Sequence, residues 1–135
     1  MISVQNLSHK YAGNADYSVR KISFDIGKGE IFGFLGPSGA GKSTVQKILT
    51  GLLKKQEGHI WIEGTEIDLL NKDFFEKIGV SFELPNLYEK LTGYENLKYY
   101  AGLFSKKTFD PLQVLSWVGL ENDAHKKASA YSKGM

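Results

Sequence analysis

Apolar and polar residues alternate along the first part of the chain, and this pattern predicts β-strands. Residues 2–11 alternate loosely, and residues 19–26 place apolar side chains at every second position towards their end. A third strand is predicted at residues 58–64, where glycines stand on both sides of a short apolar run. Residues 68–77 are predicted to be helical, with Asp73 placed to favour the helix start.

Two nearly continuous apolar runs predict a second kind of strand. Residues 31–35 have the sequence Ile-Phe-Gly-Phe-Leu, and residues 78–82 have the sequence Ile-Gly-Val-Ser-Phe. Uninterrupted apolar runs are typical of strands in a parallel sheet that is covered on both faces. We therefore expect both runs to be buried strands, the second ended by the turn-forming residues 84–86.

The last third of the chain changes to helical spacing. Thr92 can cap a helix that carries apolar residues three and four positions apart. Asp110 and Pro111 can start a second helix, which Gly119 ends. Residues 122–130 predict a short polar helix.

This change of pattern divides the chain into two parts. Residues 1–84 form the strand-rich part, which includes the glycine-rich motif described next, and residues 85–135 form the helical part. We expect a subdomain boundary near residues 84–85, because a proline interrupts the pattern there.

A glycine-rich motif follows the first apolar run. Residues 36–44 fit the pattern Gly-x-x-x-x-Gly-Lys-Ser/Thr at every constrained position. Residues 31–35 before it are predicted as a strand and residues 45–53 after it as a helix, which is the context of a phosphate-binding loop. The motif consists of Gly36, Pro37, Ser38, Gly39, Ala40, Gly41, Lys42, Ser43 and Thr44.

The residue types of this motif suit a chain of phosphates bound together with magnesium. Glycines let backbone N–H groups wrap round phosphate oxygens, and the helix that begins near Lys42 directs its positive dipole end at them. The Lys42 ammonium adds a full charge, and the Ser43 hydroxyl can ligate magnesium. A glycine turn beside an ordinary surface lysine is the alternative, and the flanking elements argue against it.

Composition narrows the classes of function. Among 135 residues, 17 are basic and 15 acidic, which gives a net charge of +2 and no dense basic stripe that would bind a nucleic acid. The chain has no cysteine, so disulfides and cysteine metal sites are excluded. No apolar run approaches the length of a membrane span, and the first residues lack the pattern of a signal peptide, so we expect a cytoplasmic protein.

Several further segments, taken with the motif, resemble the ATP-binding subunit of an ABC transporter. Residues 22–30 resemble the two strands that precede the phosphate loop in that family, and residues 78–83 occupy the place of its Q-loop strand. Residues 131–135, Tyr-Ser-Lys-Gly-Met, resemble the variant signature motif of drug and polysaccharide exporters. The other segments that carry the resemblance are residues 49–52, 58–64 and 91–97.

The resemblance implies an α/β fold, that of a P-loop NTPase with an ABC-type ATPase domain, and a site for ATP and magnesium. Tyr11 matches the aromatic residue that stacks on adenine in the family, with a core tyrosine at a strand end as the alternative. Residues 42–44 match the phosphate cradle. Ser132 and Gly134 match the signature residues that bind the terminal phosphate of ATP held by the opposite subunit.

The resemblance also implies partners. In the family, ATP joins two ATP-binding subunits into a head-to-tail dimer, and hydrolysis reopens the dimer. That motion drives export through a separate transmembrane permease subunit. We therefore expect a peripheral position on the inner face of the cell membrane.

Two features depart from the family pattern. Glu83 stands in place of the Q-loop glutamine, where a carboxylate can ligate magnesium but adds negative charge near the phosphates; a solvated glutamate at a strand end is the alternative. No apolar run ending in Asp-Glu follows, and His9, His59 and His125 lie in the wrong places for the switch histidine, so we expect surface or strand-end positions for them. We expect the N-terminal part of a subunit, incomplete at the signature motif and unable to hydrolyse ATP alone.

Two other functions are compatible with parts of the sequence. A guanylate kinase-like nucleotide kinase can share the Gly-Pro-Ser-Gly-x-Gly-Lys-Ser string, but about thirty residues of strand pattern precede it here, and residues 131–135 have no role in a kinase. A nucleotide-binding or interaction module without catalysis is the second alternative. Phosphate release from the purified chain distinguishes this non-catalytic module from an ATP hydrolase.

Overall fold

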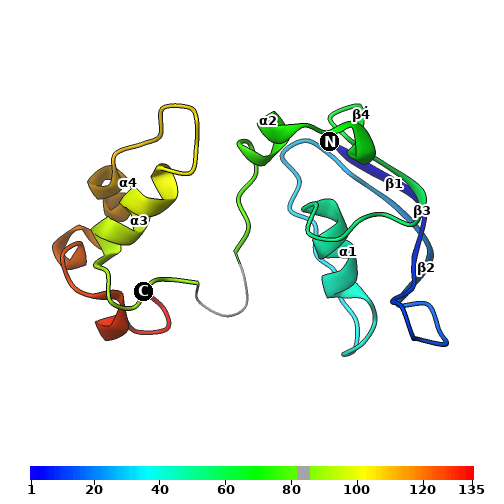
Figure 1. The fold of residues 1–135 in the computed structure, drawn as a ribbon, viewed down its shortest axis with the longest axis horizontal. Coiled ribbons are helices and arrows are strands. Elements are labelled where there is room, and N and C mark those ends of the chain that lie inside the picture. Colours follow the sequence, from blue (N-terminus) through cyan, green and yellow to red (C-terminus); the bar gives the residue numbers. More distant parts are fainter. Residues whose placement is uncertain (82–85) are drawn as a thin grey trace. The chain divides into compact units, whose positions relative to one another are not determined.

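The computed structural model describes residues 1–81 and 86–135 of the chain. Contacts between residues divide it into two compact units, Met1–Ile78 and Gly79–Met135 (Figure 1). The first unit holds all the described strands, and the second holds two of the α-helices. The glycine-rich motif belongs to the first unit.

The sheet of the first unit has the strand order β2-β1-β3-β4, and every neighbouring pair is antiparallel (Figure 1). The three strands predicted at residues 2–11, 19–26 and 58–64 are therefore confirmed, and a fourth, very short strand forms a hairpin with the third. The strands are β1 (Ile2–His9), β2 (Val19–Ile26), β3 (Glu57–Ile62) and β4 (Thr65–Glu66).

The core of this unit forms where the helix α1 (Lys42–Leu49) packs on the sheet. Val45 and Ile48 of α1 are buried in one cluster with side chains from the first three strands. Full burial of such an aliphatic side chain stabilises the fold by about 1.5–3 kcal/mol. The strand residues of the cluster are Val4, Leu7, Val19 and Ile60.

The central strand β1 is irregular, and Gly58 of β3 allows these two strands to pair closely. The register of β1 shifts near Asn6, whose φ is 51°, and the Asn6 N–H donates to the Ser23 hydroxyl over 2.9 Å. Gly58 lies opposite with φ 86°, and a Cβ there would come within 2.5 Å of the Gln5 carbonyl oxygen and 2.6 Å of the Asn6 carbonyl oxygen. Only glycine fits this close approach.

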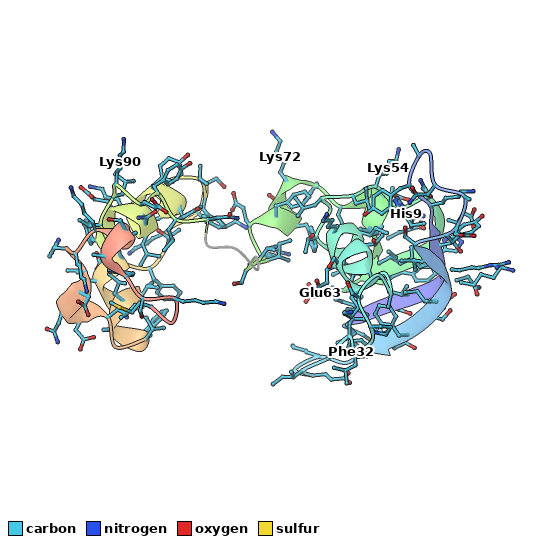
Figure 2. All side chains as sticks on the ribbon, turned by 90° about the horizontal axis from the view of Figure 1, so that it is seen from below. His9, Phe32, Lys54, Glu63, Lys72 and Lys90 are labelled. Carbon is cyan, nitrogen blue, oxygen red and sulfur yellow. The ribbon has the colours of Figure 1, made fainter. Side chains whose placement is uncertain are left out.

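The apolar run at residues 31–35 does not form the predicted strand. Phe32 stacks on Phe24 of β2 with ring centroids 5.2 Å apart (Figure 2), but Ile31 is 100% exposed and Leu35 97% exposed. A strand needs a neighbour to satisfy its backbone groups, and none of the described strands pairs with this run. The prediction of a buried parallel strand is therefore wrong.

The described part of the second predicted parallel strand, at residues 78–82, does not form a strand either. Residues 78–81 form no strand, and residues 82–85 lie outside the described residues. The helix predicted at 68–77 is split into a 3-10 turn at Ile67–Leu69 and the short helix α2 (Lys72–Phe75). The split occurs because Asn71 has an extended backbone and its side chain caps α2 by accepting from the Asp73 N–H.

Two of the three helices predicted for the second unit are confirmed. The helix α3 (Gly93–Ala101) begins with a capping box, in which the Thr92 hydroxyl accepts from the Glu95 N–H and the Glu95 carboxylate accepts from the Thr92 N–H. The helix α4 (Pro111–Trp117) has Asp110 as its cap, and the chain then turns at Gly119, whose φ is 71°.

The prediction of a short polar helix at residues 122–130 is wrong. Two 3-10 turns, Glu121–Asp123 and Ala128–Ala130, stand in its place. Backbone groups of this segment form hydrogen bonds with the residues around the start of α3 instead. The Tyr94 N–H donates to the Ala124 carbonyl, and the Ala128 N–H donates to the Leu91 carbonyl. These bonds tie the segment to the start of α3 and compete with a continuous helix.

The close approach at Gly58 gives a first prediction with a matched control. Gly64 has a similar φ of 83°, but a Cβ there meets nothing within 4 Å. Gly64→Ala should lose about 1–2 kcal/mol of unfolding free energy from its left-handed backbone. Gly58→Ala should lose about 1–3 kcal/mol more, because its methyl group collides with β1. Urea denaturation measures both, and equal losses would contradict the assigned contact.

The capping box gives a second prediction. The Thr92 N–H, by its hydrogen bond, holds the pKa of the Glu95 carboxyl below its usual value of about 4.3. The bond between the Glu95 carboxylate and the Thr92 N–H therefore stabilises the start of α3 above about pH 4.3, and this stabilisation is lost as the pH falls through the lowered pKa. The Thr92 amide signal in NMR should therefore titrate with a midpoint below about 4.3.

Glu95→Gln is the control for this titration. A glutamine can still accept from the Thr92 N–H, so the cap should persist without the titration. A wild-type midpoint at or above the ordinary glutamate value would show that the carboxylate does not cap the helix.

Candidate functional site

The glycine-rich motif forms a loop that leads into α1. Gly41 is the residue before the helix, with φ 85°, and no side chain caps the helix start. The first hydrogen bond of the helix runs from the Val45 N–H to the Gly41 carbonyl over 3.0 Å. The N–H groups of residues 42–44 have no acceptor within the helix, so they are available to an anion at its positive end.

Gly41 also fixes the loop against the first strands. A Cβ at this position would collide with the Ser18 carbonyl oxygen and would lie 2.9 Å from the Val19 side chain. The backbone of the motif therefore lies directly on the residues that begin β2. This approach requires glycine for space as well as for its positive φ.

The Lys42 ammonium lies over the start of the motif. It donates to the Gly36 carbonyl and to the Pro37 carbonyl, each over 2.7 Å. A charged group that is already held at the loop can stabilise the negative charge of a bound phosphate without a large rearrangement.

A pocket of about 400 Å³ opens between this loop and the end of β1. Tyr11 and residues 38–44 both line this pocket. Gly36 and Pro37 take part through their carbonyls, which hold Lys42. The pocket thus combines a flat aromatic ring, a set of backbone N–H groups and a cation.

Sequence reasoning missed two residues that line this pocket. Asn14 and Ser18 belong to the segment between β1 and β2 and lie beside the motif. Neither residue carried a signal for a binding site, and the place of Ser18 depends on contact with Gly41, far away in the sequence. Only the fold itself brings the two segments together.

Two residues beside the pocket hold the Tyr11 ring. The Tyr11 hydroxyl shares a hydrogen bond of 3.3 Å with the Thr44 hydroxyl. His9, labelled in Figure 2, meets the same ring edge to face, with centroids 4.9 Å apart and an interplanar angle of 79°. His9 ends β1 as expected, but it is buried with only 3% exposure, so a surface position is excluded for it.

The other two histidines have different surroundings. His59 is exposed, and its Nδ1 lies 2.9 Å from the Glu66 carboxylate. His125 is exposed in the second unit and lies beside the Tyr94 ring at 5.7 Å between centroids. Both positions agree with the expected surface location.

The predicted signature residues belong to the second unit. Ser132 and Gly134 follow Tyr131, whose hydroxyl donates to the Asp123 carbonyl over 2.8 Å. Burial, together with the nearby Asp123 charge, raises the pKa of Tyr131. The Tyr131 hydroxyl also lies at the first residue of α3, where a Cβ on Gly93 would collide with it. Tyr131 is therefore a fixed anchor for the segment that carries Ser132.

The remaining predicted site residue is Glu83, which lies outside the described residues. Among the residues that the structure describes, no group of three His, Cys, Asp or Glu side chains is placed to hold a metal ion. Within the same residues, no helix has the length and apolar character that a membrane span requires.

A family model described as "ABC transporter" matches residues 19–135. This chain belongs to the ABC transporter family. It is 52% identical over 135 residues to the fluoroquinolones export ATP-binding protein of Mycobacterium tuberculosis (strain CDC 1551 / Oshkosh), covering 100% of this chain and 45% of that protein. It is 36% identical over 135 residues to the lantibiotic transport ATP-binding protein of Streptococcus pyogenes, covering 100% of this chain and 57% of that protein.

Solved structures agree with this assignment. A dimeric, post-hydrolysis state of an ATP-binding cassette bound to ADP and Pi matches with a TM-score of 0.79 and 28% identity, over 99% of this chain and 64% of that chain. The α/β fold of the P-loop, ABC-type ATPase cassette is thereby confirmed. The guanylate kinase-like alternative is set aside. The chain spans 45% of the fluoroquinolones export protein, so the activity and partners of a whole subunit remain proposals.

The contact between Gly93 and Tyr131 gives a third prediction. Gly93→Ala should lower the unfolding free energy by about 1–3 kcal/mol, because the new methyl group displaces the tyrosine hydroxyl. Tyr131→Phe should lose about 0.5–1.5 kcal/mol with its hydrogen bond to Asp123. The double variant should lose less unfolding free energy than the sum of the two single losses, because the Tyr131 hydroxyl that collides with the new methyl group is absent.

Gly79→Ala is the control, because a Cβ there meets nothing within 4 Å. Denaturant unfolding of the four variants measures the coupling. Strictly additive losses would mean that Tyr131 does not lie against the start of α3.

Proposed function

We propose that this chain binds ATP with magnesium in the pocket between Tyr11 and residues 36–44, as part of the ATP-binding subunit of an ABC exporter. The observation that carries the proposal is the pocket itself, which is lined by an aromatic residue, Tyr11, and by a phosphate-type loop at the start of α1. The donor groups fit a nucleotide triphosphate, because backbone N–H groups and an ammonium suit phosphates and a flat ring suits a base.

Each group of the pocket has a proposed task. The N–H groups of residues 42–44 and the Lys42 ammonium bind the phosphate oxygens, and the Ser43 hydroxyl is a ligand of magnesium. The Tyr11 ring stacks on adenine. Magnesium, when bound, would screen the phosphate charges and assist transfer of the terminal phosphoryl group.

The residues outside the pocket are proposed from their match to the family alone. Glu83 is proposed as a further magnesium ligand at the Q-loop position. Ser132 and Gly134 are proposed to bind the terminal phosphate of ATP held by a second subunit. The two parts at residues 1–84 and 85–135 are proposed as the strand-rich and helical subdomains of one cassette.

The proposed transport role is export through a separate membrane permease, with the subunit on the inner face of the membrane. Support comes from the named relatives, which are ATP-binding proteins of fluoroquinolones export and lantibiotic transport. In the whole subunit we propose that ATP closes a dimer and that hydrolysis reopens it. Phosphate release from the chain at high protein concentration measures whether this part turns over ATP.

Lys42→Ala gives the fourth prediction. Removal of one ammonium near several phosphate oxygens should weaken binding of ATP and magnesium by about 10- to 100-fold, the range of a lost charged hydrogen bond. The unfolding free energy should change far less, because the ammonium bonds only exposed carbonyls. Isothermal titration calorimetry measures the affinity.

Lys47→Ala is the matched control. It removes the same charge from the same helix, but from an exposed position in the last turn. Its ATP affinity should remain close to that of the wild type. If Lys42→Ala binds ATP as tightly as Lys47→Ala does, the pocket is not the nucleotide site.

A further inference from the structure

The Tyr11 side chain is held at two points before any ligand arrives. Its hydroxyl shares the 3.3 Å hydrogen bond with Thr44, and its ring lies edge to face with His9. Both partners are buried, Thr44 with 7% exposure and His9 with 3%. A side chain between two buried partners has few orientations open to it.

The bond to Thr44 connects two different parts of the pocket. Tyr11 follows the end of β1, whereas Thr44 lies in the first turn of α1, 33 residues further along the chain. Thr44 is also the last residue of the glycine-rich motif. The hydrogen bond therefore sets the position of the aromatic ring relative to the loop that is proposed to bind the phosphates.

A ring that is placed in advance should bind a base more tightly than a ring that must first be ordered. Ordering a side chain on binding costs free energy, and a contact that is already present in the free protein removes part of that cost. The phenylalanine ring has the same stacking face but no hydroxyl, so it cannot be held by Thr44.

We infer that Thr44 is a positioning residue for Tyr11, and that recognition of the base depends on the hydroxyl pair as well as on the aromatic ring. The inference rests on the proposed function, since it assigns the base side of the same pocket. The oxygen–oxygen distance of 3.3 Å is longer than that of a strong hydroxyl bond. The expected effect is therefore moderate.

The test compares two ligands, ATP and inorganic triphosphate, each with magnesium. Both carry the phosphates, but only ATP carries a base. The measured quantity is the ratio of the two affinities, in which any effect on phosphate binding alone cancels. Tyr11→Phe and Thr44→Val should each lower this ratio by about 3- to 10-fold, the range expected for one lost hydrogen bond.

Three further variants make the test specific. The double variant should lower the ratio no more than either single change, because both remove the same bond. Thr44→Ser keeps the hydroxyl and should restore the ratio. Tyr17→Phe removes a phenol hydroxyl from the same segment, where it donates to Glu57 over 3.3 Å, and should leave the ratio at its wild-type value.

The outcomes separate this inference from the proposed function. If triphosphate binds in a Lys42-dependent manner and Tyr11→Phe keeps the wild-type ratio, the positioning role is wrong while the nucleotide site stands. If the single changes are additive, the two hydroxyls act independently and the inference fails. If the wild type binds neither ligand, the proposed function and this inference fall together.

Discussion

The packing of α1 against the antiparallel sheet is the interaction on which the candidate site depends. Val45 and Ile48 are buried among side chains of the first three strands, and Thr44 is buried one residue earlier. Burial of the two aliphatic chains stabilises this arrangement by about 1.5–3 kcal/mol each. Because the first turn of α1 also carries the motif residues, the same packing fixes the direction in which the free N–H groups point.

A second contact fixes the other side of the loop. Gly41 lies against the Ser18 carbonyl, so no side chain separates the motif from the residues at the start of β2. The segment between β1 and β2 carries both Ser18 and Tyr11, and the Tyr11 hydroxyl reaches back to Thr44. The base side and the phosphate side of the pocket are therefore held by one set of contacts.

Short-range signals in the sequence predicted most of the elements. Thr92 marks one helix start, and Asp110 with Pro111 marks another, through bonds to residues two or three positions away, and the structure forms both caps. The prediction was wrong for residues 31–35 and for the described residues 78–81, because an apolar run indicates that a segment prefers burial but not which strand will pair with it. Asn14 was missed for a related reason, since its place in the pocket depends on contacts distant in sequence.

The run before the motif shows how the loop is held without strand pairing. Phe32 and Phe34 cover Phe24 on one side, while Ile31 and Leu35 face solvent, which forfeits about 1.5–3 kcal/mol for each exposed side chain. The start of the loop is instead tied by Lys42, which bonds the carbonyls that follow this run. In the free protein, the ammonium thus organises the same loop in which it is proposed to bind phosphate. The hydrogen bonds from the Lys42 ammonium to these carbonyls are exposed and modest in strength. The ammonium can therefore leave a carbonyl oxygen and bind a phosphate oxygen at little cost in energy.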